Sequence, residues 1–257
     1  MIPNEENPKV KSLARALRLL ECFTTQEPEW GVTELAEKLN MAKSNAHSII
    51  STFEQMGYLR QLPNKKYTLG FRMLEYAFAI NQNLGYPKAV YDLVLKTADM
   101  TGQIVYFGIP YGTKVLYLYV AHPVARMKDF PYREILGETA PLCGTGIGRA
   151  ILANLPEEEW ESRIPDEIVR LTPNTMTDRW MIMEELRRTR ARGYAVDDEE
   201  REIGLRCVGV PVFNSSGKLV AGISTSGPAA SITDYKMMEC ANILTGAAAQ
   251  MKERIYR

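Results

Sequence analysis

Residues that carry catalytic or metal-binding chemistry are scarce in this sequence. Its 257 residues include only two histidines, at positions 47 and 122, and four cysteines, at positions 22, 143, 207 and 240. No two cysteines have the C-x-x-C spacing of zinc sites and redox motifs, and their scattered positions argue against a disulfide framework. We therefore expect reduced thiols, no metal site and no cofactor.

Long apolar runs are also missing. No window approaches the roughly 18 apolar residues of a membrane span, and the N-terminal stretch MIPNEENPKVKS lacks the apolar core of a signal peptide. The sequence thus predicts a cytoplasmic protein with no membrane partner. Its 46% hydrophobic content is sufficient for the core of one large domain or two ordinary ones.

The formal net charge is zero, but the charges are unevenly distributed along the chain. Residues 38–72 contain six lysines and arginines and a single acid, Glu54, so this segment has a charge of +5. A polyanion such as DNA would be bound by this segment alone. An ordinary solvated basic surface has the same composition, so the charge by itself leaves both interpretations open.

Three short amphipathic segments fill the first 56 residues. SLARALRLLECF has apolar residues at helical spacing, VTELAEKL places Thr33 where it would cap a second helix, and Ala46, Ile49 and Ile50 lie on one face of a third. Residues 40–42 form a tight turn between the last two. Three such helices are typical of a helix-turn-helix unit.

The next segment, GYLRQLPNKKYTLG, has two short β-type runs around the breaker pair Pro63-Asn64. This hairpin, or wing, would press Lys65 and Lys66 at its tip against a phosphate backbone. The strongly apolar helix FRMLEYAFAINQNL follows, and we expect it to pack on another chain or another domain. The sequence therefore predicts a winged helix-turn-helix domain over residues 1–70 and a linker helix over residues 71–83.

From residue 84 onward, helical and β-rich segments alternate. Helical patterns occur in VYDLVLKTADMTG, GIGRAILANL, TDRWMIMEELRRTRARG and the segment from Asp234 to about Arg254. QIVYFGIPYGTKVLYLYVAH and LRCVGVPVFNSSGKLVAGISTSG each contain two β runs joined by turn residues. Antiparallel strand pairs with helices around them predict an α+β sensor-type domain over residues 84–257.

The third helix is the candidate recognition helix. In a helix-turn-helix the second helix lies in the major groove, and its early exposed residues face the base edges. Asn pairs with adenine, Lys reaches guanine or a phosphate, and Ser and His donate to either. These positions hold Lys43, Ser44, Asn45, His47 and Ser48. The alternative is an interaction module that binds no DNA; the wing and the local charge favour DNA.

The glycine-rich stretch LCGTGIGRAIL is a poor match to the dinucleotide-binding pattern G-x-G-x-x-G. Arg149 stands where the final glycine would fall, and no long apolar strand precedes the motif. The glycines stand just before an apolar helix, where backbone N–H groups are able to hold an anion such as a carboxylate. Close packing explains Gly144, Gly146 and Gly148 equally well.

The acidic run from Asp197 to Glu200 is typical of a solvated loop, and Cys207 is typical of a small core residue. A nucleophilic Cys207 would need a nearby base, and His122 is the only histidine outside the first domain. Nothing in the spacing supports that pairing, or a metal site made of Asp197, Cys207 and Cys143. We assign no catalytic residue; an enzyme or redox sensor that uses Cys207 is the alternative function.

The order of these segments resembles the IclR family of bacterial transcriptional regulators over nearly the whole chain. SLARALRLLECF, VTELAEKLNMAKSNAHSIISTFEQMGYL and YTLG resemble its winged helix-turn-helix. GETAPLCGTGIGRAILA and RGYAVDDEEREIGLRCVGVPVFNSSGKLVAGISTSGP resemble the two signature stretches of its effector-binding domain. The resemblance implies a GAF-like effector domain, a homodimer or homotetramer, and a ligand-responsive regulator, more often a repressor, that binds double-stranded operator DNA and a small carboxylate effector.

The resemblance also implies which residues line the effector pocket. They are Cys143, Gly146, Ile147, Asp197, Leu205, Cys207, Ser224 and Ser226. Backbone N–H groups and serine hydroxyls suit a carboxylate, while Asp197 accepts a hydrogen bond from a hydroxyl. Ile147 stands where the family commonly has the smaller Ala, which should narrow the pocket. Ser48 replaces a frequent Arg of the recognition helix, so the operator sequence should differ from the common one.

Overall fold

The structure is a computed structural model that describes residues 8–126 and 137–256. The chain divides after Leu84 into two compact units, one N-terminal and one C-terminal, and each is described by itself. The part of the chain described here includes no helix that is both long and apolar enough to cross a membrane.

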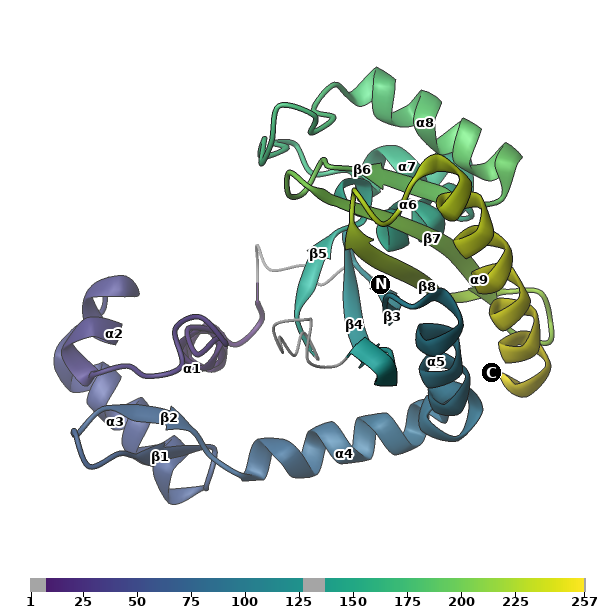
Figure 1. The fold of residues 1–257 in the computed structure, drawn as a ribbon. Helices are drawn as coiled ribbons and strands as arrows, with labels where there is room; N and C mark the ends of the chain where they lie inside the picture. The colour runs from purple at the N-terminus through teal and green to yellow at the C-terminus, as the bar shows by residue number, and fades with distance from the viewer. Residues whose placement is uncertain (1–7, 127–136, 257) are drawn as a thin grey trace. The chain divides into compact units, whose positions relative to one another are not determined.

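The N-terminal unit is a small helical domain with a two-stranded hairpin (Figure 1). Its elements are α1 (Lys11–Glu21), α2 (Val32–Lys38), α3 (Lys43–Gln55), β1 (Leu59–Gln61), β2 (Tyr67–Leu69) and α4 (Arg72–Leu84). Leu19, Leu35, Ile50 and Leu59 are buried in one core shared by the three helices and the hairpin. The predicted helix-turn-helix and wing are thus confirmed.

The predicted cap of α2 is wrong. The helix begins at Val32, so Thr33 lies inside it, and Gly31 takes the extended conformation of a capping residue. The Glu34 carboxylate accepts a hydrogen bond from the Gly31 N–H at 2.7 Å. An acid in the first helical turn satisfies a backbone donor and interacts favourably with the helix dipole, so no hydroxyl is needed.

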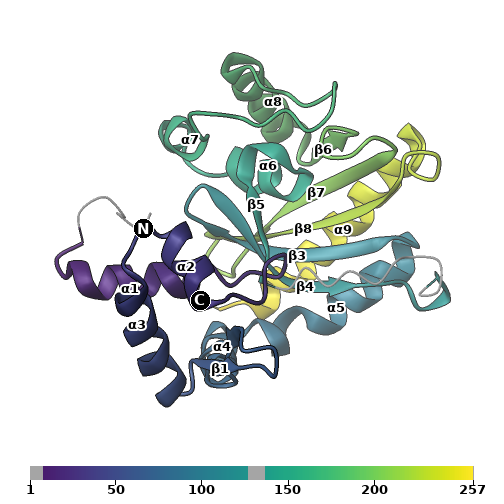
Figure 2. The same cartoon turned by 90° about the vertical axis from the view of Figure 1, so that its left-hand side faces the viewer.

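The C-terminal unit is a three-layer α+β domain. Its elements are α5 (Tyr86–Thr101), β3 (Ile104–Tyr111), β4 (Lys114–Ala121), β5 (Thr139–Pro141), α6 (Gly146–Ala153), α7 (Glu157–Arg163), α8 (Arg179–Arg192), β6 (Ala195–Asp198), β7 (Leu205–Phe213), β8 (Leu219–Pro228) and α9 (Asp234–Arg254). The strands form an antiparallel sheet in the order β5-β4-β3-β8-β7-β6. Helices α5 and α9 cover one face, and α6, with α7 and α8 outside it, covers the other (Figure 2).

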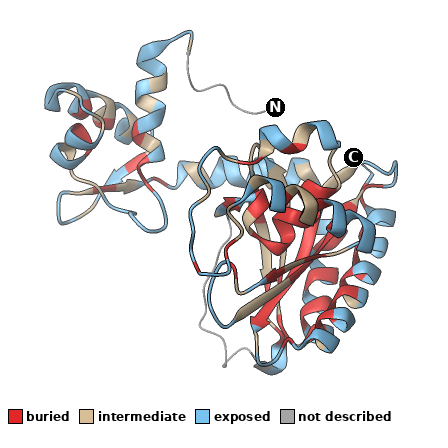
Figure 3. Ribbon diagram, turned by 90° about the horizontal axis from the view of Figure 1, so that it is seen from above, coloured by how far each residue is buried: buried red, intermediate tan, exposed pale blue. Residues whose placement is uncertain are grey.

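The core of the C-terminal unit lies on both faces of the sheet, and buried residues fill its central strands and α6 (Figure 3). All eight residues of α6 are buried, which agrees with its apolar sequence GIGRAILA. The predicted strand pairs and the helices α5, α6, α8 and α9 are confirmed. Three short elements, α7, β5 and β6, were not predicted, because each has too few residues for a clear hydrophobic period.

A β-bulge in β4 changes which face its tyrosines occupy. Phe107 pairs with Tyr119, but the next residue, Gly108, pairs with Tyr117, so Leu118 is the extra residue. Tyr119 therefore packs against Tyr91 of α5, whereas Tyr117 belongs to the core on the α6 side. The bulge places one tyrosine of this strand beside α6 and its preceding loop.

Candidate DNA-binding and effector sites

The early residues of α3 are available for contact with DNA. Lys43, Ser44, Asn45, His47 and Ser48 are all exposed, while Ala46 and Ile50 are buried in the domain core. The Ser48 hydroxyl donates to the backbone oxygen of Ser44 at 3.0 Å, so it is partly occupied within the helix. One face of α3 thus anchors the helix, and the other presents polar side chains.

The two wing lysines differ in their surroundings. Lys65 is exposed and has a positive φ of 64° at the tip of the hairpin. The Lys66 ammonium instead contacts both carboxylate oxygens of Glu34, at 2.8 and 3.1 Å, and this contact lowers the pKa of Glu34. Asn64 donates to Glu29 at 3.0 Å. The wing therefore presents the Lys65 ammonium to solvent and holds Lys66 against α2.

Three predicted effector residues form a row across neighbouring strands. Asp197 of β6 pairs with Cys207 of β7, and Cys207 pairs with Ser226 of β8. Directly paired residues of an antiparallel sheet point to the same face, and the Cys207 thiol donates to the Ser226 hydroxyl at 3.1 Å. Ser224, two residues before Ser226, is on that face as well. Ser224 is only 3% exposed.

The segment of residues 144–148, which includes the start of α6 and is called the glycine loop below, lies directly on this row. A Cβ atom on Gly146 would approach Cys207 Cβ to 3.3 Å, and one on Gly209 would meet the Gly146 oxygen at 2.5 Å. Ile147 side-chain atoms lie over the glycines Gly108 and Gly222. Close packing is therefore one function of these glycines. It also brings the first backbone N–H groups of α6 to the side chains of the row, as an anion site requires.

The other predicted effector residues lie around this centre. Leu205 is half-buried at the start of β7. Cys143 packs with its side chain in the apolar core on the α6 side, next to the loop, and its carbonyl oxygen accepts from Arg149 Nε at 2.8 Å. The structure thus brings all eight residues to one region, between the glycine loop and the part of the sheet formed by β6, β7 and β8.

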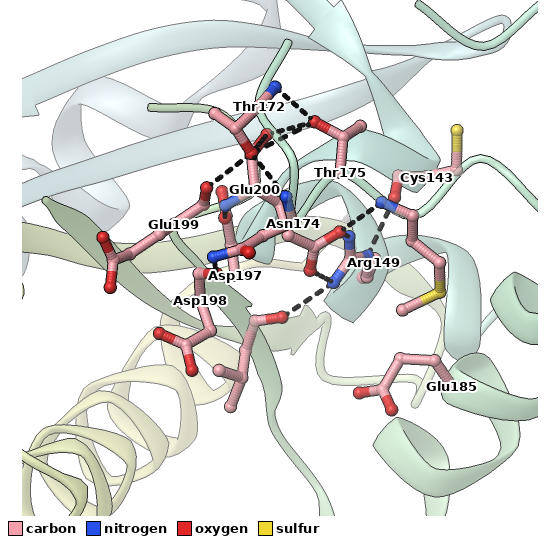
Figure 4. Close-up of polar contacts among 12 residues, drawn as sticks. Cys143, Arg149, Thr172, Asn174, Thr175, Glu185, Asp197, Asp198, Glu199 and Glu200 are labelled. Carbon is pink, nitrogen blue, oxygen red and sulfur yellow. Dashed lines mark hydrogen bonds and ion pairs between the residues drawn. The ribbon is translucent and has the colours of Figure 1, made fainter. Parts of the chain in front are cut away.

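A buried ion pair holds this region together (Figure 4). The Arg149 guanidinium donates to the two carboxylate oxygens of Glu200 at 2.6 and 2.5 Å, and also to the backbone oxygen of Val196 at 2.9 Å. The Thr172 and Thr175 hydroxyls donate to the backbone oxygen of Glu200 at 3.1 and 2.6 Å. The network connects α6, β6 and the 172–176 segment, and it satisfies both buried charges.

The prediction of a solvated acidic loop at residues 197–200 is wrong for two of its four acids. Asp197 is 1% exposed and Glu200 is 8% exposed, because Asp197 lies in β6 and Glu200 pairs with Arg149. The Asp197 carboxylate accepts from the Glu200 N–H at 3.0 Å. Burial raises the pKa of Asp197, and the nearby Arg149 opposes this shift.

The Cys207 thiol is not prepared for nucleophilic chemistry. Burial raises its pKa to about 12, the charge of Asp197 adds to the shift, and only smaller effects oppose it. A nucleophilic cysteine needs a lowered pKa or an adjacent base. Among the described residues, no group of three or more His, Cys, Asp or Glu side chains is arranged to bind a metal ion.

Sequence patterns alone did not identify the Arg149–Glu200 network. The one usable signal was a charged residue, Arg149, in an otherwise apolar helix, because a buried charge requires a partner. The partner lies 51 positions away in a run of four acids, and nothing in that run distinguishes Glu200.

Together, a winged helix-turn-helix and an α+β domain with a polar cluster beneath a glycine loop define a transcriptional regulator with a separate ligand-binding domain. Comparison with known protein families leads to the same class of protein. Residues 89–253 match the family described as "Bacterial transcriptional regulator IclR C-terminal", and residues 12–63 match "IclR helix-turn-helix domain". The chain belongs to the IclR family.

Individual relatives cover nearly the whole chain. The HTH-type transcriptional regulator XynR of Escherichia coli is 30% identical over 232 residues, which are 90% of this chain and 91% of that protein. The Transcriptional repressor IclR of Escherichia coli is 26% identical over 251 residues, 95% of this chain and 89% of that protein. Homologous regulators of this family thus include repressors.

Solved structures share the fold. An IclR homolog from Microbacterium hydrocarbonoxydans, solved in complex with 4-hydroxybenzoate, has a TM-score of 0.81 at 20% identity and covers 94% of this chain and 98% of that one. That likeness supports the α+β architecture of the C-terminal unit and the helix-turn-helix of the N-terminal unit.

Proposed function

We propose that this protein is a repressor that binds a roughly palindromic operator through α3 and the wing and is controlled by a small organic acid in the C-terminal unit. The observation that carries the effector half is the row of Asp197, Cys207 and Ser226 on neighbouring strands, which lies directly beneath the glycines at the start of α6. The IclR homolog bound to 4-hydroxybenzoate supports an acid as the ligand.

The proposed pocket comprises Cys143, Gly146, Ile147, Asp197, Leu205, Cys207, Ser224 and Ser226. Serine hydroxyls and the first N–H groups of α6 hold the carboxylate, and Asp197 accepts from a hydroxyl of the ligand. The Ile147 side chain restricts the size of the ligand, because it already fills the space over Gly222. Binding shifts the DNA affinity by a coupling free energy of roughly 1–3 kcal/mol.

The protein acts as a homodimer or homotetramer in this proposal. Helix α4 covers most of the proposed linker over residues 71–83 and has no buried residue; its Leu74 and Phe78, and Phe71 just before it, are more than 60% exposed. Helix α1 likewise exposes Leu13 and Leu17. Such apolar surfaces on short helices favour packing against a second copy. A symmetric dimer requires operator half-sites about one helical turn apart. Because the protein acts on DNA in this proposal, we also propose that it is located in the cytoplasm.

Selection from a random duplex library tests the DNA half of the proposal. The purified protein should enrich a palindrome with half-sites about 10 base pairs apart, and its affinity should fall steeply as salt is raised. A reporter gene behind the selected operator should be repressed. Enrichment of no sequence, or binding that salt does not weaken, contradicts the proposed function.

The alternative of an enzyme or redox sensor that uses Cys207 has no comparable support. The pKa of about 12 keeps this thiol protonated at neutral pH, and its hydrogen bond to Ser226 is one between two neutral groups.

A further inference from the structure

The start of α4 lies against the C-terminal end of the recognition helix α3. Gly70, which comes shortly before α4, donates its N–H to the Tyr58 carbonyl oxygen at 2.7 Å. A Cβ atom on Gly70 would lie 2.1 Å from the Gly57 carbonyl oxygen, so only a glycine allows this close approach. The backbone that leads into α4 is therefore in direct contact with the turn that ends α3.

Arg72, the first residue of α4, adds a side-chain connection. Its guanidinium donates at 3.0 Å to the carbonyl oxygen of Met56, the capping residue at the end of α3. The guanidinium also lies over the Tyr58 ring, 5.5 Å from the centroid. A cation at the C-terminus of a helix satisfies a free carbonyl oxygen and complements the helix dipole. Arg72 thus connects α4 directly to α3.

Tyr76, one turn further along α4, makes a second connection. Its ring stacks on the Tyr58 ring with 5.9 Å between centroids and 6° between planes, and the two hydroxyls form a hydrogen bond at 2.7 Å. Tyr58 in turn packs edge-on against Phe53 of α3, with 5.9 Å between centroids. The three residues Tyr58, Arg72 and Tyr76, called the latch below, thus join α4 to α3 at several points.

Beyond the latch, α4 is not enclosed by its own domain. The helix has no buried residue, and residues 77–80 are all exposed. The orientation of α4 relative to α3 therefore depends on the contacts at its start. Two stacked rings, two hydrogen bonds and a glycine contact are enough to define one orientation, because they act at different points along the helix.

The latch and the apolar surface of α4 lie on opposite sides of the helix. Each residue of an α-helix turns by about 100°, so residues four apart share a face and residues two apart are separated by about 200°. Arg72 and Tyr76 thus share one face, and Leu74 and Phe78 share the opposite one. The exposed Leu74 and Phe78 belong to the surface proposed above to pack against a second copy.

A dimer joined through α4 would therefore have its recognition helices placed by the latch. One side of α4 contacts the second copy, and the other side holds α3. Two half-sites are bound together only when the two recognition helices have the matching separation. One added base pair moves a half-site by about 3.4 Å and rotates it by about 34°, which a rigidly attached helix is unable to follow.

We propose that Tyr58, Arg72 and Tyr76 are positioning residues that set the half-site spacing of the operator, because they hold α4 in one orientation on α3. The inference deepens the proposed function and rests on it, since it takes the DNA-binding dimer from there. The role requires no contact between these three residues and DNA.

Operators with altered spacing test this role on the full-length protein. The three duplexes are the selected palindrome, the same palindrome with two base pairs inserted between its half-sites, and a single half-site. The insertion should weaken wild-type binding at least about 10-fold. The double variant Arg72→Met, Tyr76→Leu should bind the single half-site like the wild type and the palindrome about 10-fold more weakly. It should bind the palindrome and the inserted duplex within about 3-fold of each other.

Matched variants separate positioning from folding. Arg188→Met with Tyr235→Leu replaces the same residue types at exposed positions of α8 and α9, and it should keep the wild-type spacing preference. Tyr76→Phe keeps the ring stack and loses only the hydroxyl, so its spacing preference should fall part of the way. Circular dichroism and analytical ultracentrifugation should show that every variant has the fold and the oligomeric state of the wild type.

Each possible outcome supports or overturns the role of the latch. A full wild-type spacing preference in Arg72→Met, Tyr76→Leu overturns it and leaves the DNA-binding dimer standing. Loss of single half-site affinity in both this variant and Tyr76→Phe also overturns it, because the residues then maintain the recognition unit itself. A monomeric double variant overturns it too, since the residues then belong to the subunit contact. If the wild type binds one half-site as tightly as the palindrome, the symmetric dimer of the proposed function is wrong, and the spacing role is wrong with it.

Discussion

Arg149 and Glu200 face each other across the effector domain as a bidentate ion pair, with the arginine 2% exposed and the glutamate 8% exposed. The arginine also donates to the carbonyl oxygen of Cys143, which precedes the glycine loop, and to that of Val196 in β6. One side chain thus fixes the distance between the loop and the strand that together form the proposed pocket.

Removing one partner of this pair should strongly destabilise the C-terminal unit. Arg149→Met leaves the Glu200 carboxylate buried without its cation, which typically costs about 3–5 kcal/mol of unfolding free energy. Urea unfolding followed by circular dichroism measures the loss. The double variant Arg149→Met with Glu200→Leu should recover much of it, because no unpaired charge remains. Arg187→Met, which breaks only the surface pairs of Arg187 with Glu157 and Glu184, should unfold like the wild type. If Arg149→Met were as stable as Arg187→Met, the buried pair would have no structural role.

The buried Asp197 should make stability depend on pH in the direction opposite to that of most carboxylates. Burial raises its pKa in the folded state, so the folded protein binds more protons than the unfolded chain above about pH 4. Its contribution to stability is therefore present at low pH and is lost as the pH rises through the folded-state pKa.

The variant Asp197→Asn removes this titration and keeps the shape of the side chain. Its stability relative to the wild type should increase from about pH 4 upward and then level off, as measured by chemical unfolding at a series of pH values. Asp166→Asn, at an exposed position, controls for the loss of one formal charge. A difference between Asp197→Asn and the wild type that is flat across the whole range would refute the raised pKa.

The thiols should be unreactive in the folded protein. Burial raises the pKa of each of the four cysteines, and at a pKa of about 12 only about one Cys207 in ten thousand is a thiolate at pH 8. Titration with a chromogenic disulfide should label the native protein slowly, and all four thiols should react in urea. A fast-reacting thiol that disappears in Cys207→Ser would instead revive the redox-sensor alternative.

The sequence was sufficient to predict the fold class because the long elements have clear periods. Helices α3 and α9 and the paired strands β7 and β8 have strong patterns, and the turn residues 214–217 join that strand pair. The resemblance in sequence was also sufficient to nominate Asp197 and Cys207, which the strand register then placed side by side.

The rest depended on contacts that are distant in sequence. Glu200 looked like one of four solvated acids until its partner 51 residues away was known. Tyr117 and Tyr119 are two residues apart, so simple alternation would place them on one face, and only the bulge at Leu118 separates them. Neither long-range pairing nor a bulge leaves a local signal in a single sequence.

The recognition helix should contribute sequence specificity through Asn45. Its side chain is exposed on the early part of α3, where an amide pairs with adenine in the major groove. Asn45→Ala should cost about 1–3 kcal/mol per half-site on the selected operator and much less on random duplex, as measured by fluorescence anisotropy. Gln55→Ala, at the far end of the same helix, should bind both duplexes like the wild type. Equal losses on both duplexes would show that Asn45 contacts phosphates rather than bases.

The two wing lysines should contribute unequally to DNA affinity, although they are adjacent in the sequence. Lys65 is exposed at the tip, whereas Lys66 contacts Glu34 at 2.8 Å and would have to leave that carboxylate to reach a phosphate. Lys65→Ala should therefore weaken binding to operator and random duplex alike and reduce the slope of log affinity against log salt by about one for each phosphate that the lysine neutralises. Lys66→Ala should have a smaller effect on both quantities.

Glu34→Gln should strengthen DNA binding, because it releases Lys66 and removes a negative charge from beside the wing. This gain should vanish in the double variant with Lys66→Ala. If Lys66→Ala weakens binding as much as Lys65→Ala, the ion pair with Glu34 does not persist on DNA.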